Sequence, residues 1–437
     1  MCSGALAPLA EHGRLPPVDH PEDRRRTQPG RQALDHPGHA SSKRPPQPRR
    51  RRAPTRLRHR HRHRHRRGDR HSLPGLSTRT SGRRCRRAQE ENRWKNRRAR
   101  CWDGAMQHDA SVVVDQGQYQ DAVTPWEQEA WRDAALGWAE RELAARGLRE
   151  TGQRRVRLRP WSVLVRLAVE DHNAVWFKAN PPGSAFEATL TSALAHWVPE
   201  HVLEPLAVDA DHGWSLLPHG GELFRDVLNR SPADPRVWEE LLGQYASMQQ
   251  ALVPYAHEIE LLGVPSARTT ALPDVFDQVI AENTTLQPDD LKRLYELRPR
   301  LVNWCTELAA VGIADSLDHS DLHDGQLFNP EPGRFTFFDW GDAAVSHPFC
   351  SFLVPARAAS TRYGSEVLPR LRDAYLEPWT GGGQTSAELR RAVTLAWRLG
   401  ALGRASSWGR LFPGATTTTG AVESANWLLQ LLTEPPI

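Results

Sequence analysis

The spacing of hydrophobic and polar residues predicts a helix followed by a small antiparallel sheet. Between Pro125 and Arg149, Trp, Ala and Leu recur every three or four residues, which is the period of an amphipathic helix. An apolar-rich run over 156–169, a polar turn over 170–173 and a second run over 174–178 predict two paired strands. Residues 205–218 carry the pattern of a further hairpin.

The second half of the chain is mostly helical by the same criterion. A short hairpin is expected over 327–338, where turn residues precede an apolar run of β-formers. The tryptophans of the last helical region are expected to pack in its interior. Helices are predicted over 237–252, 289–308, 365–379 and 386–402, with a breaker at 381–383, and the tryptophans are Trp397, Trp408 and Trp427.

Composition divides the 437 residues near position 105. Residues 1–100 contain 29 Lys and Arg against 8 Asp and Glu, whereas the remainder contains 28 against 44, so the formal net charge of +5 describes neither part. The first hundred residues also hold no Phe, Tyr or Ile, and Trp94 is their single aromatic residue. A segment with so little apolar surface cannot offset the entropy of ordering its chain, so residues 1–105 are predicted to be disordered.

The Arg/His alternation over 56–66 leaves several interpretations of this basic segment open. A metal-binding His tract is disfavoured because arginine cations stand between the ligands, and a nucleic-acid arm lacks interleaved aromatic residues for base stacking. Two further interpretations are a natural disordered tail and a misassigned start. The second is suggested by Met106, which precedes the first globular-looking sequence by about twenty residues. Nucleic-acid binding would rest on this segment alone.

Other whole-chain features favour a cytosolic location. The five cysteines lack C-x-x-C spacing, which indicates neither a zinc site nor a disulfide framework. No apolar run reaches the length of a membrane span, and the N-terminus lacks the apolar core of a signal peptide. We therefore expect a reducing, cytoplasmic location and no membrane partner.

Two neighbouring motifs carry the candidate chemistry. The first is His319-Ser-Asp321-Leu-His-Asp-Gly-Gln326, and the second is Asp339-Trp-Gly-Asp342. In the kinase catalytic loop, an Asp accepts the proton of the substrate hydroxyl, a residue five positions later holds magnesium, and the Asp of a following D-F-G motif holds it too. Asp321 and Gln326 keep that five-residue step, and Asp339 stands in the place of the D-F-G aspartate.

These motifs resemble those of the aminoglycoside phosphotransferase family, which is similar to choline kinases and, more distantly, to protein kinases. The resemblance extends from about residue 159 to about residue 352, and more loosely to the C-terminus. It implies an α+β, bilobal protein kinase-like fold. The expected parts are a disordered segment 1–105, an N-terminal helix and β-rich nucleotide-binding lobe over 106–220, and a mainly helical lobe over 221–437 with the catalytic and metal-binding loops.

The resemblance also implies residues that bind the nucleotide. Lys178, at the end of a predicted strand, is expected between the phosphates. Glu187 is expected to be its ion-pair partner. Alternatively, Glu187 and Ser184 form a capping box, in which Glu187 only accepts a hydrogen bond from the first backbone amide of the helix. Backbone groups around Leu217, His219 and Gly220 would meet the adenine edge. The chain has no G-x-G-x-x-G, so cradling of the phosphates by backbone amides is not predicted.

The resemblance assigns the remaining roles within the two motifs. Asp321 is the expected catalytic base, and His319 is expected to brace its loop. Asp339 is the expected magnesium ligand, with Gln326 as second ligand, although the family usually has Asn there and a Gln oxygen is displaced by about one bond length. His323, Asp324 and Asp342 are expected around these groups or on the acceptor side.

The resulting hypothesis is an ATP- and Mg²⁺-dependent phosphotransferase. It would transfer the γ-phosphoryl group of ATP, or of GTP, to a hydroxyl of a small acceptor. The acidic body agrees with a cationic acceptor such as an aminoglycoside, while amino alcohols, sugars and macrolides fit equally well. The alternative is a nucleotide-binding pseudokinase or regulatory module with little transferase activity, which the missing glycines and Gln326 favour.

Overall fold

The described part of the protein comprises residues 112–230, 234–331, 333–414 and 417–437 of a computed structural model. Contacts between Cα atoms divide the chain into Met1–Arg98 and Ala99–Ile437, and all described residues belong to the second unit. The predicted disordered segment 1–105 therefore lies outside the described residues. The predicted lobe boundaries stay predictions.

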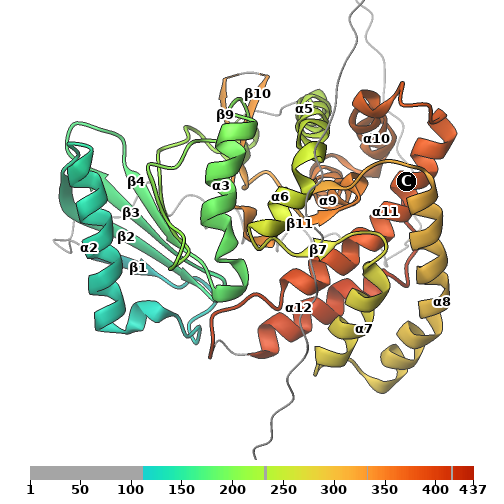
Figure 1. Ribbon diagram of the computed structural model, residues 1–437, viewed down its shortest axis with the longest axis horizontal. Helices are drawn as coiled ribbons and strands as arrows, with labels where there is room; N and C mark the ends of the chain where they lie inside the picture. The colour runs from blue at the N-terminus through green and yellow to red at the C-terminus, as the bar shows by residue number, and fades with distance from the viewer. Residues whose placement is uncertain (1–111, 231–233, 332, 415–416) are drawn as a thin grey trace, which may run out of the picture. The chain divides into compact units, whose positions relative to one another are not determined.

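A six-stranded sheet forms the first part of the described chain, in the order β1-β2-β3-β4-β6-β5. Strands β1 to β4 lie side by side in Figure 1. Strand β1 runs parallel to β2, and the other neighbouring strands are antiparallel. The strands are β1 Val112–Asp115, β2 Glu150–Arg159, β3 Ser162–Val169, β4 Val175–Ala179, β5 Ala207–Asp209 and β6 Trp214–Leu217.

The prediction of one strand over 156–169 is wrong, because the run is divided between β2 and β3. The division falls at Pro160 and Trp161, between Arg159 and Ser162, which pair with each other across the turn. Proline has no backbone N–H and cannot donate to a central ladder, so it marks the turn. The turn between the first two antiparallel strands is therefore at 160–161, and not at 170–173.

Helix α2 (Glu129–Ala145), preceded by the 3-10 turn η1 (Pro125–Glu127), covers one face of this sheet (Figure 1). The ring of Phe177 lies 6.3 Å from that of Trp131 and 6.1 Å from that of Trp138. Phe177 therefore points towards α2. Because side chains alternate along a strand, Lys178 points to the opposite face of the sheet.

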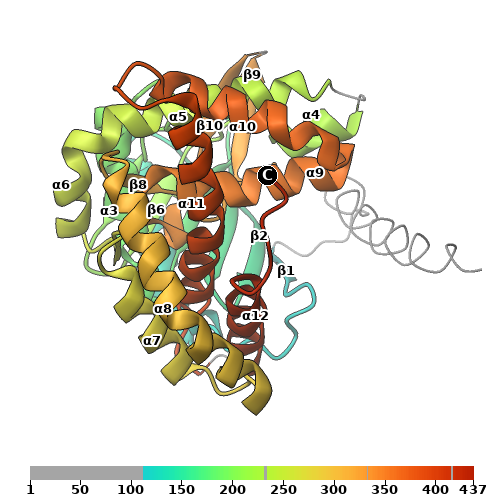
Figure 2. The same ribbon diagram turned by 90° about the vertical axis from the view of Figure 1, so that its right-hand side faces the viewer.

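The rest of the described chain is mainly helical. Helices α7, α8, α11 and α12 pack side by side (Figure 2). The helices are α3 Phe186–Trp197, α4 Phe224–Arg230, α5 Arg236–Leu252, α6 Ala256–Leu261, α7 Leu272–Glu282, α8 Pro288–Ala310, α9 Leu353–Tyr363, α10 Leu368–Leu376, α11 Ser386–Ser407 and α12 Thr417–Gln430. The strands here are β7 Ser266–Ala267, β8 Ser316–Asp318, β9 Leu327–Glu331, β10 Arg334–Phe337 and β11 Ala344–Ser346. None of the helices in the described ranges is long and apolar enough to cross a membrane.

Two hydrophobic cores hold these elements. One lies between α2 and the six-stranded sheet, and the larger one joins α3 to the helices that follow β6. We call the part up to β6 the small lobe and the part from α4 onwards the large lobe. The predicted α+β fold, with a β-rich lobe before a helical lobe, is confirmed. Trp397 is buried in the larger core as predicted, whereas Trp408 and Trp427 are only partly buried.

Candidate active site

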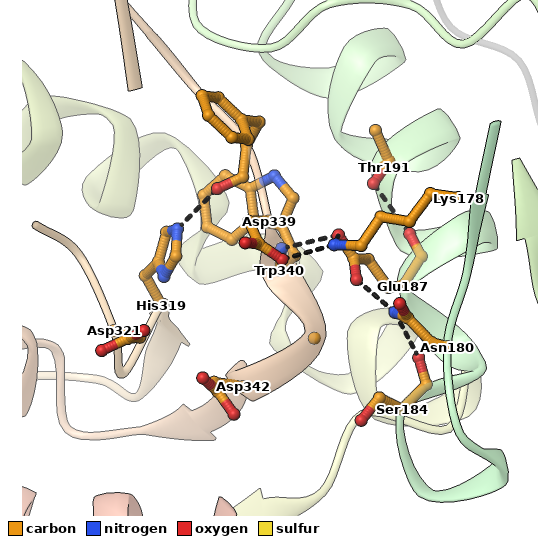
Figure 3. Close-up of polar contacts among 12 residues, drawn as sticks. Lys178, Asn180, Ser184, Glu187, Thr191, His319, Asp321, Asp339, Trp340 and Asp342 are labelled. Carbon is orange, nitrogen blue, oxygen red and sulfur yellow. Dashed lines mark hydrogen bonds and ion pairs between the residues drawn. The ribbon is translucent and has the colours of Figure 1, made fainter. Parts of the chain in front are cut away.

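A chain of charged groups joins the small lobe to the loop after β10 (Figure 3). The ammonium of Lys178, on β4, lies 2.6 Å from Oε1 of Glu187 on α3 and forms a second ion pair with Asp339. Lys178 and Glu187 are both buried. The structure therefore brings together three residues that the sequence separates by as many as 161 positions.

Of the two expected roles of Glu187, the structure favours the ion pair. Helix α3 has Ala185 at its N-cap and no side-chain cap hydrogen bond, so Ser184 forms no capping box. The Glu187 carboxylate instead accepts hydrogen bonds from the backbone N–H of Trp340, at 3.0 Å, and from the side-chain amide of Asn180. Glu187 thus connects the loop of Asp339 directly to the small lobe.

Asp339 sits in a left-handed backbone conformation, with φ 69° and ψ 58°. Aspartate tolerates this region better than most residues, and such conformations recur at active sites. Burial acts to raise the pKa of Asp339, but Lys178 and then Arg157 outweigh that effect and hold it far below its usual range. The carboxylate is therefore ionised at neutral pH, as a magnesium ligand must be.

His319 connects the two predicted motifs. Its Nε2 lies 2.9 Å from the carbonyl oxygen of Phe338, the residue before Asp339 (Figure 3). Because a carbonyl only accepts, the proton of this imidazole is on Nε2. The backbone N–H of His319 donates to the hydroxyl of Tyr245 at 3.0 Å. This buried histidine thus fixes the start of the Asp321 loop to the start of the Asp339 loop.

Asp321 shares a buried arginine with Asp342. The guanidinium of Arg404, on α11, lies 3.1 Å from Oδ1 of Asp321 and 2.9 Å from Oδ2 of Asp342. Burial raises the pKa of Asp321 while Arg404 opposes that rise. At Asp342 burial acts in the same direction, but Arg404 and Arg410 outweigh it and lower the pKa. Asp321 is therefore the more basic carboxylate of the two.

The neutral imidazole of His323 lies beside Asp321. Its Nδ1 accepts from the backbone N–H of Gly325, at 2.9 Å, and lies 3.1 Å from a guanidinium nitrogen of Arg225. Since both partners are donors, Nδ1 must carry the lone pair and Nε2 the proton. Burial lowers the pKa of His323, which agrees with this neutral form. Its Nε2 lies 3.8 Å from Asp321, and Arg225 also binds Asp324 at 2.7 Å.

The residues present fit a magnesium ion that is completed by substrate. Asp339 offers an ionised, partly exposed carboxylate. The side-chain amide of Gln326 has no hydrogen-bond partner within the described ranges, so its oxygen is available. Within those ranges no group of three or more His, Cys, Asp or Glu could hold a metal alone. Magnesium commonly binds one or two protein ligands together with phosphates and water.

The three residues predicted to meet the adenine lie at the end of β6 and just after it. Leu217 is the last residue of that strand, and the ring of His219 accepts a hydrogen bond from Gly221 N at 2.9 Å. Gly220 packs directly against the ring of Phe328. No hydrogen bond or ion pair in the described part of the chain joins these residues to the Lys178 group.

Several polar residues of this region were not predicted from the sequence. Arg404 could have been noticed, because it interrupts the apolar side of α11 between Ala401 and Ala405, where an arginine needs a buried partner. Asn180 and Arg225 carry no comparable signal in the sequence. Their importance comes from partners that lie in other elements, Glu187 and Asp324.

Residues 163–390, just over half of the chain, match the phosphotransferase enzyme family. A search of curated proteins finds no significant match.

Similar solved structures include a macrolide 2'-phosphotransferase from Brachybacterium faecium (18% identity, 69% of this chain and 99% of that chain, TM-score 0.45). Others are an ethanolamine kinase from Plasmodium vivax (11% identity, 67% and 82%, TM-score 0.46) and a choline/ethanolamine kinase family protein from Mesorhizobium loti (14% identity, 69% and 96%, TM-score 0.47). The family and the enzyme class predicted from the sequence are confirmed, and the chain belongs to the phosphotransferase enzyme family.

Proposed function

We propose that the protein transfers the γ-phosphoryl group of ATP or GTP, with Mg²⁺, to a hydroxyl of a small molecule. The observation that carries this proposal is the continuous ion-paired group of Glu187, Lys178 and Asp339. In kinases the corresponding lysine–glutamate pair and metal-binding aspartate must both be in place for transfer. Here Lys178 pairs with both carboxylates.

Asp321 is the proposed base of the reaction. It orients the acceptor hydroxyl and takes its proton late in a loose transition state. Its pKa is raised by burial, which favours proton acceptance, while Arg404 opposes that rise. His319 is proposed as a positioning residue, because it contacts Phe338 and the loop backbone.

Asp339 and Gln326 are the proposed residues for holding magnesium. When bound, the ion neutralises charge on the nucleotide phosphates. Lys178 adds a compact positive charge beside the same phosphates, and Glu187 fixes the ammonium in place. Leu217, His219 and Gly220 are proposed to meet the adenine edge through their backbone groups, since they lie at the end of the last strand of the small lobe and just after it.

Cationic hydroxyl compounds, such as aminoglycosides and amino alcohols, are the proposed first acceptors to test. The support is the excess of acidic over basic residues after position 100, which attracts cations to the surface. Near Asp321 this excess is reduced, because Arg404 lies between Asp321 and Asp342, and Arg225 pairs with Asp324. Neutral sugars and macrolides therefore belong in the same panel.

The proposal is tested by following phosphoryl transfer from ATP and from GTP to this panel with the full chain. Asp321→Asn should reduce turnover by about two to four orders of magnitude while leaving nucleotide affinity largely intact. Asp339→Asn should remove the magnesium-dependent part of nucleotide affinity as well. Asp133→Asn, an exposed residue of α2, is the matched control and should change neither. A chain that binds neither nucleotide contradicts the proposal.

The alternative is a nucleotide-binding module without transferase activity. It is favoured by the turn at Pro160 and Trp161, which lacks glycine, and by Gln326 in place of the usual Asn. Under this alternative, nucleotide would bind with magnesium, but no acceptor in the panel would be phosphorylated. Asp321→Asn would then leave the phosphorylation of every acceptor at the same background level as wild type. Nucleic-acid binding would depend on residues 1–105, so deletion of that segment would abolish it.

We place the reaction in the cytosol. Cys305 and Cys350 are both free and buried, which agrees with a reducing compartment. Fractionation of cells that express the full chain tests this location, and recovery outside the cytosolic fraction would contradict it.

A further inference from the structure

Arg157 stands in the same cross-strand row as Lys178. On β2 it pairs with Leu164 of β3, and Leu164 pairs in turn with Lys178 of β4. Residues in one row point to the same face, and two strand spacings amount to about 10 Å. Val156 and Leu158 are buried against α2, so the alternation along β2 independently places Arg157 on the face of Lys178.

The surroundings of Arg157 lack a dedicated protein partner. Within the described ranges its side chain makes no hydrogen bond or ion pair, and its Nε atom is buried and unsatisfied. Burial lowers the pKa of Arg157, and the Asp339 carboxylate is the largest opposing influence. Lys178 already pairs with that carboxylate. The Arg157 side chain is half-buried, with its Nε atom buried and its terminal guanidinium nitrogens without a protein partner in the described part of the chain. A cation that shares its nearest anion with another cation is well suited to bind a further anion.

The neighbouring Arg159 differs in this respect. Its guanidinium lies 2.9 Å from Oδ2 of Asp115 and donates to the Asp115 carbonyl oxygen, also at 2.9 Å. Arg159 is therefore already paired with a residue of β1, the strand at the edge of the sheet. The turn that follows it is fixed as well, because Phe412 N donates to the Pro160 carbonyl at 2.8 Å and the Trp161 ring lies 5.5 Å from that of Trp408. Proline has no backbone N–H, and the contacts with Phe412 and Trp408 hold the turn in place. This turn therefore does not offer the successive backbone N–H groups with which a glycine-rich loop binds phosphate.

We propose that Arg157 binds the terminal phosphates of the nucleotide, in place of the backbone amides that a glycine-rich turn provides in protein kinases. The assignment rests on the proposed function, and it adds a residue that the catalytic motifs do not contain. A guanidinium presents several donors to phosphate oxygens, so one arginine can replace several amides. Lys178 and Arg157 would then approach the polyphosphate from two strands of one sheet.

The experiment measures dissociation constants of the full chain for adenosine, ADP and ATP, and for guanosine, GDP and GTP, by titration calorimetry with Mg²⁺. Arg157→Met should weaken the binding of phosphorylated ligands by about 10- to 100-fold and leave the nucleosides unchanged. The affinity of Arg157→Lys for the phosphorylated ligands should lie between those of Arg157→Met and wild type. Arg141→Gln removes the same charge from the exposed side of α2 and should bind every ligand as wild type does.

The stability of the ligand-free variants distinguishes binding from a structural role. Because Arg157 is an unpaired cation, Arg157→Met should melt at the same temperature as wild type or higher. Unchanged affinity for ATP and GTP overturns the proposal, and so does a lower melting temperature with equal losses for nucleosides and nucleotides. If the wild-type chain binds no nucleotide at all, the proposed function itself fails, which is a separate outcome.

Discussion

The guanidinium of Arg404 lies 3.1 Å from the carboxylate of Asp321. Replacement of Arg404 by Met would remove the largest influence that opposes the raised pKa of Asp321, and leave Asp342 as an unscreened neighbour. The pKa of Asp321 should therefore rise further. Since the proposed base must be deprotonated, the acidic limb of the profile of kcat/KM against pH should move to higher pH.

Arg404→Lys is the control for this prediction. It keeps the positive charge but loses the planar fork that reaches both carboxylates, so the acidic limb should stay near its wild-type position while turnover falls. Arg404→Met should also lower the free energy of unfolding by about 1–3 kcal/mol, because two half-buried carboxylates lose the guanidinium that they share. An acidic limb that does not move in Arg404→Met would show that Arg404 does not control the protonation of Asp321.

Glu187→Gln separates the charge of Glu187 from its hydrogen bonding. The Gln carbonyl can still accept from the backbone N–H of Trp340, but the partner charge of Lys178 is lost. The Gln amide nitrogen also replaces the oxygen that accepts from Asn180. We expect kcat/KM to fall about tenfold in Glu187→Gln. In Glu187→Ala it should fall further, because this variant also leaves a buried N–H unsatisfied. Steady-state kinetics with the preferred nucleotide measures both.

The matched control is Glu142→Gln, which breaks the Glu142–Arg146 pair at 2.7 Å on α2. Both of those side chains are about one-third exposed, so the cost in unfolding free energy should be about 0.5 kcal/mol or less, with no kinetic effect. Equal rates for Glu187→Gln and wild type would mean that Lys178 needs only Asp339.

The two motifs of the candidate site could be found in the sequence because the residues of each are close together along the chain. Asp321 and His319 lie on one loop, and the hairpin of β9 and β10 brings that loop next to Asp339. The roles of Arg404 and Arg157 could not be predicted, because each depends on which residues of another lobe or helix face it. The strand break at Pro160 was missed for a related reason, since apolar residues continue on both sides of the turn.

His319→Phe tests the link between the two loops. The substitution keeps an aromatic ring but removes the Nε2–H that donates to the Phe338 carbonyl at 2.9 Å. The free energy of unfolding should fall by about 1–3 kcal/mol, because the carbonyl loses its donor inside the protein. His319→Gln can place an amide N–H near the same carbonyl and should recover part of the loss. Urea unfolding followed by tryptophan fluorescence measures the difference.

An exposed histidine provides the comparison for that measurement. His257 on α6 has a side chain that is 79% exposed, with Glu260 3.9 Å away. His257→Phe should therefore change the free energy of unfolding by no more than about 0.5 kcal/mol. If His319→Phe were as mild as this control, the hydrogen bond to Phe338 would not hold the loops together.

Gly220→Ala tests the close packing after β6. A Cβ atom at this position would lie 2.1 Å from Cε2 of Phe328, whose ring stacks on that of Phe338 at 4.4 Å. Because Phe338 precedes Asp339 and binds His319, displacement of Phe328 would disturb both candidate loops. We expect the free energy of unfolding to fall by about 1–3 kcal/mol. Nucleotide affinity should fall with it, if Gly220 lies at the adenine edge.

Gly243→Ala is the matched substitution within the same lobe. Gly243 lies inside α5, and the nearest atom to its added Cβ is the carbonyl oxygen of Ala374, at an ordinary contact distance of 3.9 Å. Alanine is the better helix former, so this variant should be about 0.5–1 kcal/mol more stable than wild type. Opposite signs for the two glycines would confirm that contact with Phe328, and not the loss of glycine itself, sets the cost. If Gly220→Ala left the free energy of unfolding unchanged, the ring of Phe328 would be free to move aside. Close packing would then not explain why this position after β6 is a glycine.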